Sequence, residues 1–305
     1  MHLPLVALAL LLLLVPAPSA EAETAETVLI RQSLEKDRSG RRRGDIELVR
    51  AACADRFVHY DARGYADPAG WVVAHEGPET YARAVAADLQ ANRYEIERAV
   101  TLLHVYQEKA FVTTVDSGWV VERTSGARRP LLSTGLWTFR KFEDEWLATA
   151  LVADVGDSAA GPYEGAAGTP AEAIAAVLRD EAAGWSKGDA GAVVDQFDEE
   201  FVAYDSYYSS DLVKLVIVLG NAREYREWLD RRLDLVDYDV QRQVLHTAVG
   251  PEGTEALAIT ADRVAVRYKL GEVTASLDRH VTWTLSRQGG SWKVTNMLLQ
   301  VKSFQ

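Results

Sequence analysis

The sequence contains Phe57-Val58-His59-Tyr60-Asp61 and, 144 residues later, Phe201-Val202-Ala203-Tyr204-Asp205. Each stretch follows a Gly-Asp pair and a short apolar helical pattern, which begin at Gly44-Asp45 and at Gly188-Asp189. A match that keeps one spacing over many residues indicates a duplicated domain.

The spacing between the copies changes once, at a turn in the second copy. After Gly250-Pro251-Glu252-Gly253 it becomes 146 residues, which relates Asp116 to Asp262 and Trp137 to Trp283. A constant spacing that breaks only at a turn is what a duplication with a lengthened hairpin produces. The 305-residue chain is also long enough for two domains.

Each copy shows the pattern of a helix, a short helix, a short strand, a third helix and a run of long strands. The third helices are predicted at 78–90 and 221–234. The long strands of the first copy are predicted at 94–105, 110–122, 131–142 and 146–153. Short connections between long strands favour an antiparallel meander curved around a helix. We therefore expect an α+β fold of two tandem cone-shaped domains with apolar interiors.

The predicted boundaries follow from composition. Residues 1–22 carry an uncharged apolar run from Leu3 to Val15 and an Ala20-Glu21-Ala22 cleavage pattern, which predicts a signal peptide and a secreted or periplasmic protein. Residues 156–169 are rich in Gly, Ala and Pro, so we expect a linker there. It separates two expected domains, at 23–155 and 170–305. No other stretch is long enough to span a membrane.

Composition limits the partners and the chemistry. The net charge is −12, so no basic face for nucleic acid is expected. The Arg41-Arg42-Arg43 run is interpreted as a solvated turn. Cys53 is the sole cysteine and is expected to be buried and inert. No spacing of His and Cys suggests a metal site, and no cofactor is predicted.

The Gly-Asp pair, the Phe-Val-x-Tyr-Asp stretch, the Gly-led third helix and the Trp-led last strand together resemble the SnoaL-like and ketosteroid-isomerase-like branch of the nuclear transport factor 2-like superfamily. The resemblance covers nearly all of both copies. It implies the fold, but members include isomerases, cyclases and dehydratases as well as noncatalytic binding modules. The fold alone therefore does not determine the activity.

The resemblance places a general base at Asp61 and Asp205. A carboxylate at the end of a strand aimed into an apolar cone would have a raised pKa, as a base requires. The alternative is that both aspartates cap turns. His59 is two residues from Asp61 and could pair with it, but the second copy has Ala203 there. A dyad is thus possible only in the first copy.

The oxyanion donors of the isomerase branch are not found in this sequence. The first-helix position of its tyrosine is occupied by Asp37 in one copy and Glu181 in the other, and the late-strand acid position falls near Trp137 and Trp283. Steroid isomerase activity is therefore not expected.

Further candidates repeat in both copies. Arg98 and Asp116, like Arg242 and Asp262, are expected either to form a structural cross-strand pair or to clamp a substrate. The candidate pocket-lining residues are Tyr60, Arg98, Asp116 and Trp137 in the first copy and Tyr204, Arg242, Asp262 and Trp283 in the second.

These observations favour a protein that binds a small, largely apolar molecule in one or both cones. The alternative is an acid/base enzyme of isomerase, dehydratase or cyclase type that uses Asp61 and His59. We expect the copies to pair as a pseudo-dimer within one chain, which is otherwise a monomer.

Overall fold

The computed structural model describes residues 24–65, 68–156, 169–205, 216–270 and 274–304. The predicted signal peptide and the interior of the predicted linker lie outside these ranges. Within the described part of the chain, no helix combines the length and the apolar composition that a membrane crossing requires.

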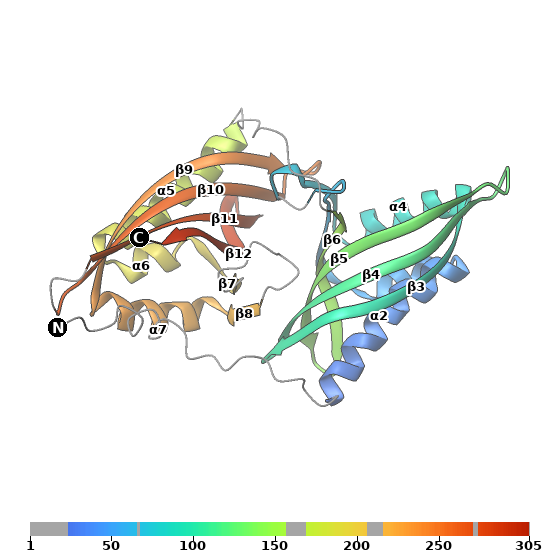
Figure 1. The fold of residues 1–305 in the computed structure, drawn as a ribbon, viewed down its shortest axis with the longest axis horizontal. Coiled ribbons are helices and arrows are strands. Elements are labelled where there is room, and N and C mark those ends of the chain that lie inside the picture. The colour runs from blue at the N-terminus through green and yellow to red at the C-terminus, as the bar shows by residue number, and fades with distance from the viewer. Residues whose placement is uncertain (1–23, 66–67, 157–168, 206–215, 271–273, 305) are drawn as a thin grey trace.

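Two six-stranded sheets dominate the structure, one from each copy of the repeat (Figure 1). The first copy contains α2 (Ala25–Arg43), α3 (Ile46–Ala51), β1 (Cys53–Asp61), η1 (Pro68–Gly70), β2 (Val72–Glu76), α4 (Pro78–Ala91), β3 (Asn92–Tyr106), β4 (Lys109–Glu122), β5 (Arg128–Phe142) and β6 (Glu145–Val155). The second contains α5 (Thr169–Lys187), α6 (Ala190–Val194), β7 (Phe197–Asp205), β8 (Val216–Leu219), α7 (Ala222–Leu233), β9 (Val236–Val249), β10 (Glu255–Tyr268), β11 (Thr274–Gln288) and β12 (Ser291–Phe304).

The two sheets have the same topology. Their strand orders are β2-β1-β6-β5-β4-β3 and β8-β7-β12-β11-β10-β9. The last four strands of each form the predicted antiparallel meander. In addition, β1 runs parallel to β6 and β7 runs parallel to β12, a pairing that the local sequence pattern did not predict. The predicted α+β class with two tandem copies is confirmed.

Matching caps begin the short helices. The carboxylate of Asp45 accepts the backbone N–H of Leu48 at 3.3 Å, and that of Asp189 accepts the N–H of Ala192 at 3.0 Å. The preceding Gly44 has a φ of 75°, in the left-handed region that favours glycine. The Gly-Asp pairs therefore end one helix and start the next, as the sequence predicted.

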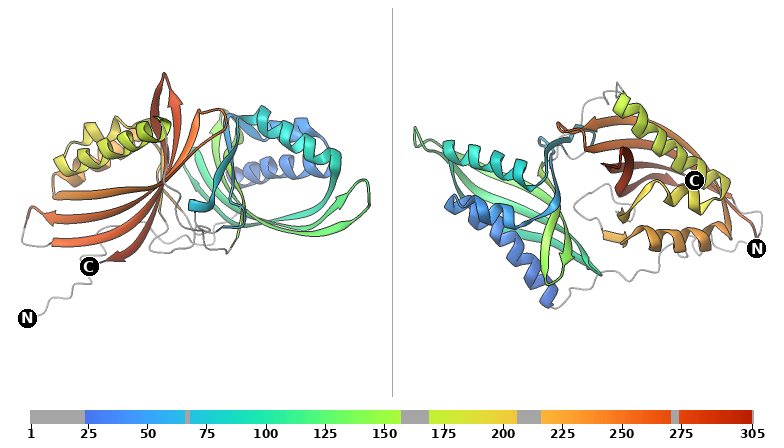
Figure 2. Two further views of the ribbon diagram at one scale, coloured as in Figure 1. Left: turned by 90° about the horizontal axis from the view of Figure 1, so that it is seen from above. Right: turned by 180° about the vertical axis from the view of Figure 1, so that it is seen from behind.

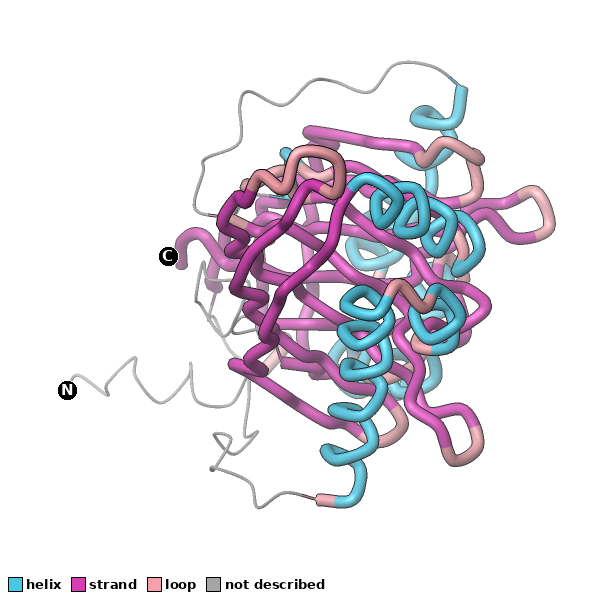
Figure 3. Tube along the Cα trace, turned by 90° about the vertical axis from the view of Figure 1, so that its right-hand side faces the viewer, coloured by secondary structure: helices cyan, strands magenta, loops and turns pink. Residues whose placement is uncertain are grey.

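The helices cover one face of each curved sheet, which gives each domain its apolar interior (Figures 2 and 3). The opposite sheet faces meet between the domains, where a shared apolar cluster forms. Its buried members come from both copies: Val58, Tyr60, Ala62, Trp71, Val73, Phe111, Leu136, Val202, Tyr204, Ile217, Leu257 and Ile259.

Two local predictions need comment. Cys53 is buried, and burial raises the pKa of its thiol, but it begins strand β1 and does not continue a helix. The interpretation of Arg41 as part of a solvated turn is wrong. It lies in the last turn of α2, and its side chain contacts the buried Asp37 in the interior of the first domain.

Candidate functional site

A buried Arg–Asp pair lies in each domain. Arg98 is directly opposite Asp116 in the sheet, and two of its nitrogens lie 2.7 Å from the two carboxylate oxygens. Arg242 and Asp262 repeat this bidentate contact at 2.8 and 2.7 Å. The geometry is that of the cross-strand pair, one of the two alternatives left open by the sequence.

In the first domain, three more groups surround Arg98. Its guanidinium lies 3.0 Å from the carboxylate of Asp37 and donates to the carbonyl oxygen of Leu34 at 3.1 Å. It also stacks over Trp137, at 5.0 Å from the ring centroid, while the Trp137 indole N–H donates to Thr114 at 2.9 Å. Trp137 is therefore held inside the packed interior.

The second domain repeats every one of these contacts. Arg242 lies 2.5 Å from Glu181, donates to the carbonyl oxygen of Leu178 at 2.9 Å, and stacks over Trp283 at 4.6 Å. The Trp283 indole donates to Thr260 at 3.0 Å. Because both copies keep the whole cluster and its members satisfy one another, we interpret it as part of the shared fold.

The two interiors differ in another place, beside this cluster. The first copy carries Arg41, Cys53, His59, His75 and Ala84 where the second carries Trp185, Phe197, Ala203, Leu219 and Trp228. Except at Ala84, the first interior thus has polar or ionisable side chains at positions that are aromatic or aliphatic in the second.

Aromatic rings fill this part of the second domain. Trp185 packs against Tyr225, Trp228 and Tyr238, with ring centroids 6.4, 5.8 and 4.7 Å apart. Its indole N–H donates to Glu181 at 2.8 Å. The arrangement is that of a packed aromatic core.

In the first domain, the same space holds a hydrogen-bonded polar network. Arg41 lies 3.3 Å from Asp37 and donates to the hydroxyl of Tyr81, which itself donates to Asp37 at 3.3 Å. Burial favours a higher pKa for Asp37, but Arg41 and Arg98 outweigh it and hold this pKa below its usual range. Asp37 is therefore ionised at neutral pH.

His59 borders this network and has a free ring nitrogen. Its ring stacks on His75 at 5.3 Å and packs against Tyr81 at 5.1 Å. Its Nδ1 is buried, and no hydrogen-bond partner for it is found among the described residues. Burial, together with the charges of His75 and Arg41, lowers the pKa of His59 to about 3. The imidazole is therefore neutral at pH 7, with one nitrogen available to a ligand.

Asp61 lies on the same strand but makes a different contact. Its carboxylate accepts the backbone N–H of Arg63 at 2.8 Å, as a turn-capping aspartate does. Burial lowers the pKa of His75, and the charge of Asp61 opposes this shift. No hydrogen bond between Asp61 and His59 is described. Asp205 ends β7 and is half-buried.

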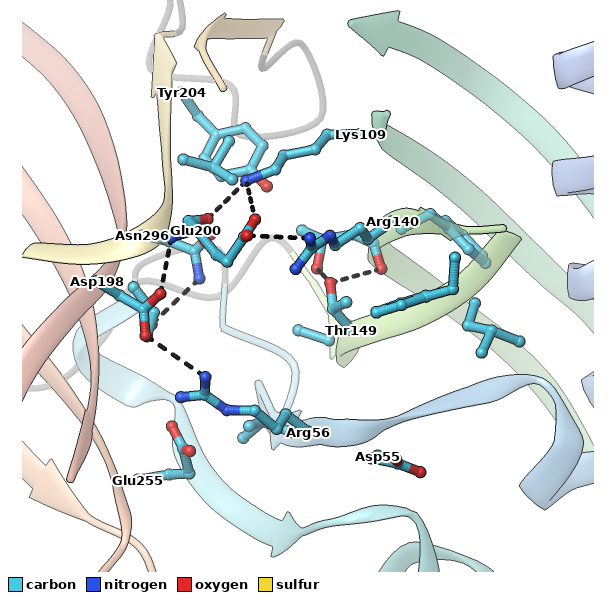
Figure 4. Close-up of a pocket in the computed structure, with 18 of the residues that line it drawn as sticks. Asp55, Arg56, Lys109, Arg140, Thr149, Asp198, Glu200, Tyr204, Glu255 and Asn296 are labelled. Atoms are coloured by element: carbon cyan, nitrogen blue, oxygen red, sulfur yellow. Dashed lines mark hydrogen bonds and ion pairs between the residues drawn. The ribbon is translucent and has the colours of Figure 1, made fainter. Parts of the chain in front are cut away.

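Tyr60 and Tyr204 lie on the opposite sheet face from His59, because successive strand residues alternate between faces. Both therefore line the space between the domains and not a cone. A cavity of about 500 Å³ lies there (Figure 4). Its lining includes charged residues from both domains: Asp55, Arg56, Lys109, Arg140, Asp198, Glu200 and Glu255.

Two groups in this interdomain cavity have shifted pKa values. Burial lowers the pKa of Lys109 to about 8, although Glu200 opposes the shift. Burial raises the pKa of Glu255 to about 8, with Arg56 opposing. Among the residues described, no group of three His, Cys, Asp or Glu side chains is placed to hold a metal ion.

Comparison with solved structures shows similar folds for single domains. The chain is similar to a ketosteroid isomerase-like protein from Erwinia carotovora atroseptica, at 17% identity and a TM-score of 0.36, over 43% of this chain and 96% of that one. It is similar to a putative scytalone dehydratase from Novosphingobium aromaticivorans, at 13% identity and a TM-score of 0.36, over 44% and 85%. It is also similar to the hexachlorocyclohexane dehydrochlorinase LinA-type3 from Novosphingobium barchaimii, at 12% identity and a TM-score of 0.37, over 44% and 87%. No protein-family model and no curated protein matches the sequence.

Each half of the chain is an α+β domain, and the two halves have the same six-stranded sheet topology. The likeness concerns the fold alone.

Sequence reasoning missed three residues of the first domain. Arg41, His75 and Tyr81 were not among the predicted site residues. A position-by-position comparison of the copies would have indicated two of them, because Arg41 corresponds to Trp185 and His75 to Leu219. Tyr81 is tyrosine in both copies, so only the contacts of its hydroxyl distinguish it.

Proposed function

We propose that this protein binds a small molecule in the interior of its first nuclear transport factor 2-like domain, and that the second domain is its structural partner. One observation carries the proposal. Within a single chain, the same fold has a polar interior at His59, His75 and Arg41 and an aromatic or aliphatic one at the matching positions.

The difference points to function because polar groups in an apolar interior lower stability unless they are satisfied. Leaving a buried polar atom without a hydrogen bond costs about 1–3 kcal/mol. The second domain shows that this fold packs well with Trp185, Ala203 and Leu219 instead. A buried His59 Nδ1 without a partner is the kind of local exception that functional sites show.

The chemistry of the site indicates the class of ligand. The rings of His59, His75 and Tyr81 offer flat surfaces, while Arg41 and the free His59 Nδ1 offer polar contacts. Arg41, His59 and His75 are half-buried, so this region borders solvent. We therefore propose a flat, largely apolar ligand that carries a polar or anionic group.

A second candidate function is acid/base catalysis in the same domain. The supporting observation is again the unpartnered His59 Nδ1, because a neutral imidazole is the form that accepts a proton. The base would be His59 with Asp61 or Tyr81 nearby, in a proton transfer, dehydration or cyclisation. Replacing His59 by Gln would abolish turnover in this case.

Export is part of the proposal, since residues 1–22 have the pattern of a signal peptide. The expected mature chain begins at Glu23. Intact-mass measurement of the protein from its native host tests this, and a mass that includes residues 1–22 would contradict it.

Native mass spectrometry of the purified full chain tests ligand binding. We expect a co-purifying small molecule whose occupancy falls at least tenfold in Tyr81→Phe, because the hydroxyl joins Arg41 to Asp37. Tyr225→Phe is the matched control at the equivalent position of the second domain, and its occupancy should stay unchanged. Equal losses in both variants, or a ligand retained in both, would contradict the assignment to the first domain.

A further inference from the structure

The domains meet through the outer faces of their sheets, and equivalent residues occupy the centre of the contact. Val58 and Tyr60 of the first domain correspond to Val202 and Tyr204 of the second, and all four are buried in the shared apolar cluster. The centre is thus apolar on both faces. It gives no preference for one kind of domain over the other.

The charged residues around this centre have opposite signs in the two copies. Arg56 and Lys109 in the first domain correspond to Glu200 and Glu255 in the second, and Arg140 corresponds to Ser286. In addition, the second domain has the buried Asp198 where the first has Ala54. At these positions the first face carries basic side chains and the second carries acidic ones.

The opposite charges contact each other across the boundary (Figure 4). The ammonium group of Lys109 is 2.6 Å from the carbonyl oxygen of Glu200 and 3.6 Å from its carboxylate. Arg140 lies 3.0 Å from the same carboxylate. Arg56 lies 3.5 Å from Asp198 and donates to the hydroxyl of Ser286 at 2.9 Å.

These contacts follow the approximate twofold relation between the domains. Lys109 meets Glu200, and the equivalent contact brings Glu255 towards Arg56, whose charge acts on it. If two first domains paired in this geometry, Lys109 would meet Arg56 of the other copy. If two second domains paired, Glu200 of one copy would take the place of Arg56 beside Asp198 of the other. Both pairings would place like charges together at the interface, which is unfavourable.

We infer that the divergence of these charges makes the interface selective for one first domain and one second domain. The partner of each face is the other domain of this chain. Two molecules of the protein would pair through these faces only if the first domain of each contacted the second domain of the other. The inference concerns assembly and holds whether or not the first domain binds a ligand.

Exchanging the faces within the full chain tests the inference. In an acidic-faced chain, the first domain carries the residues of the second copy, through Arg56→Glu, Lys109→Glu and Arg140→Ser. Both of its interface faces are then of the second-domain kind. A basic-faced chain carries Asp198→Ala, Glu200→Arg, Glu255→Lys and Ser286→Arg, the residues of the first copy. By small-angle X-ray scattering, each should show a larger radius of gyration than the wild type, because its domains separate. A chain with both sets of changes should be compact again.

Mixing provides the direct measurement of selectivity. The acidic-faced and basic-faced chains should each sediment as monomers, and an equimolar mixture should form a heterodimer, since basic faces then meet acidic ones. Self-association of either variant alone, or a wild-type radius of gyration in both, would overturn the inference.

A milder comparison covers the case in which the exchanged chains do not fold. Arg140→Gln and Glu200→Gln should each lower the urea midpoint. The decrease in the double variant should be clearly smaller than the sum of the two single decreases. The exposed pair of Arg128 and Glu95, 2.7 Å apart in the first domain, serves as the control and should show little coupling. Strictly additive losses at Arg140 and Glu200 would also overturn the inference.

Discussion

The carboxylate of Glu76 accepts the backbone N–H of Thr254 at 3.2 Å, 178 residues further along the chain. It also accepts the N–H groups of Glu252 and Glu255, each at 3.1 Å, and is only 5% exposed. Three backbone donors of one turn in the second domain thus hold one side chain of the first. Gly220 occupies the position equivalent to Glu76, so this contact has no mirror image in the other direction.

We expect Glu76→Ala to destabilise the protein by about 3 kcal/mol, because three backbone donors lose a charged acceptor in a buried place. Urea unfolding measures the change. Glu79→Ala is the control, since the Glu79 side chain is 69% exposed and pairs with Arg50 on the surface. Its effect should stay under about 1 kcal/mol. Equal effects of the two substitutions would show that the contact does not stabilise the fold.

For the turn that binds Glu76, the sequence predicted the hairpin but not its contact with the first domain. The shift in repeat spacing at Gly250–Gly253 correctly located a longer hairpin, because turn residues act locally. The contact between this hairpin and Glu76 joins residues that are far apart in the chain. A local sequence pattern does not predict such a contact. The parallel pairing of β1 with β6 went unpredicted for the same reason.

Removing the buried arginine from either domain should be strongly destabilising. Arg98→Leu leaves Asp37 and Asp116 without their shared cation, and Arg242→Leu does the same to Glu181 and Asp262. We expect a loss of about 3–5 kcal/mol of unfolding free energy in each case. Calorimetry or urea titration measures it, with the exposed Arg93→Leu as reference. A loss below about 1 kcal/mol would mean that the carboxylates find other partners.

The low pKa of His59 predicts how stability depends on pH. Its folded-state pKa of about 3 lies below the ordinary value of 6.5, so the unfolded chain binds the proton first. The stabilisation is complete above about pH 6.5 and is lost progressively as the pH falls towards 3. Between pH 7 and pH 5, His59 should account for a loss of about 2 kcal/mol.

The variant His59→Ala, which has the residue of the second copy, should remove this part of the pH dependence. Urea titrations of both proteins at pH 7 and pH 5 measure the difference. An unchanged slope in His59→Ala would show that other groups cause the acid sensitivity.

Glu255 should have the opposite dependence. Its pKa is raised from 4.5 to about 8, so its stabilising effect is present below pH 4.5 and is lost as the pH rises through 8. Glu255→Gln should therefore be more stable than the wild type at pH 8 by about 1 kcal/mol, allowing for partial exposure. The two should be equal near pH 4.

The neighbouring exposed residue gives the control for this measurement. Thermal unfolding of Glu252→Gln should follow the wild type at both pH values. If Glu255→Gln is destabilising at pH 8, the ionised Glu255 must have a favourable partner in the interface.

The site was less predictable than the fold. The repeated positions drew attention to Arg98, Asp116 and Trp137, which the structure shows satisfying one another in both copies. The polar network of the first domain became visible at the positions where the copies differ. Side-chain direction decides such a network, and single residues such as Arg41 do not reveal it in a sequence.

The parallel pairing of β1 with β6 has a consequence for synthesis on the ribosome. The strand at Cys53–Asp61 cannot pair with Glu145–Val155 until roughly another hundred residues have been translated, and such distant pairings form slowly. The basic outer face of the first domain then stays uncovered while the second copy is made. A newly made first domain therefore exposes the like charges of Arg56, Lys109 and Arg140, which oppose its pairing with another first domain.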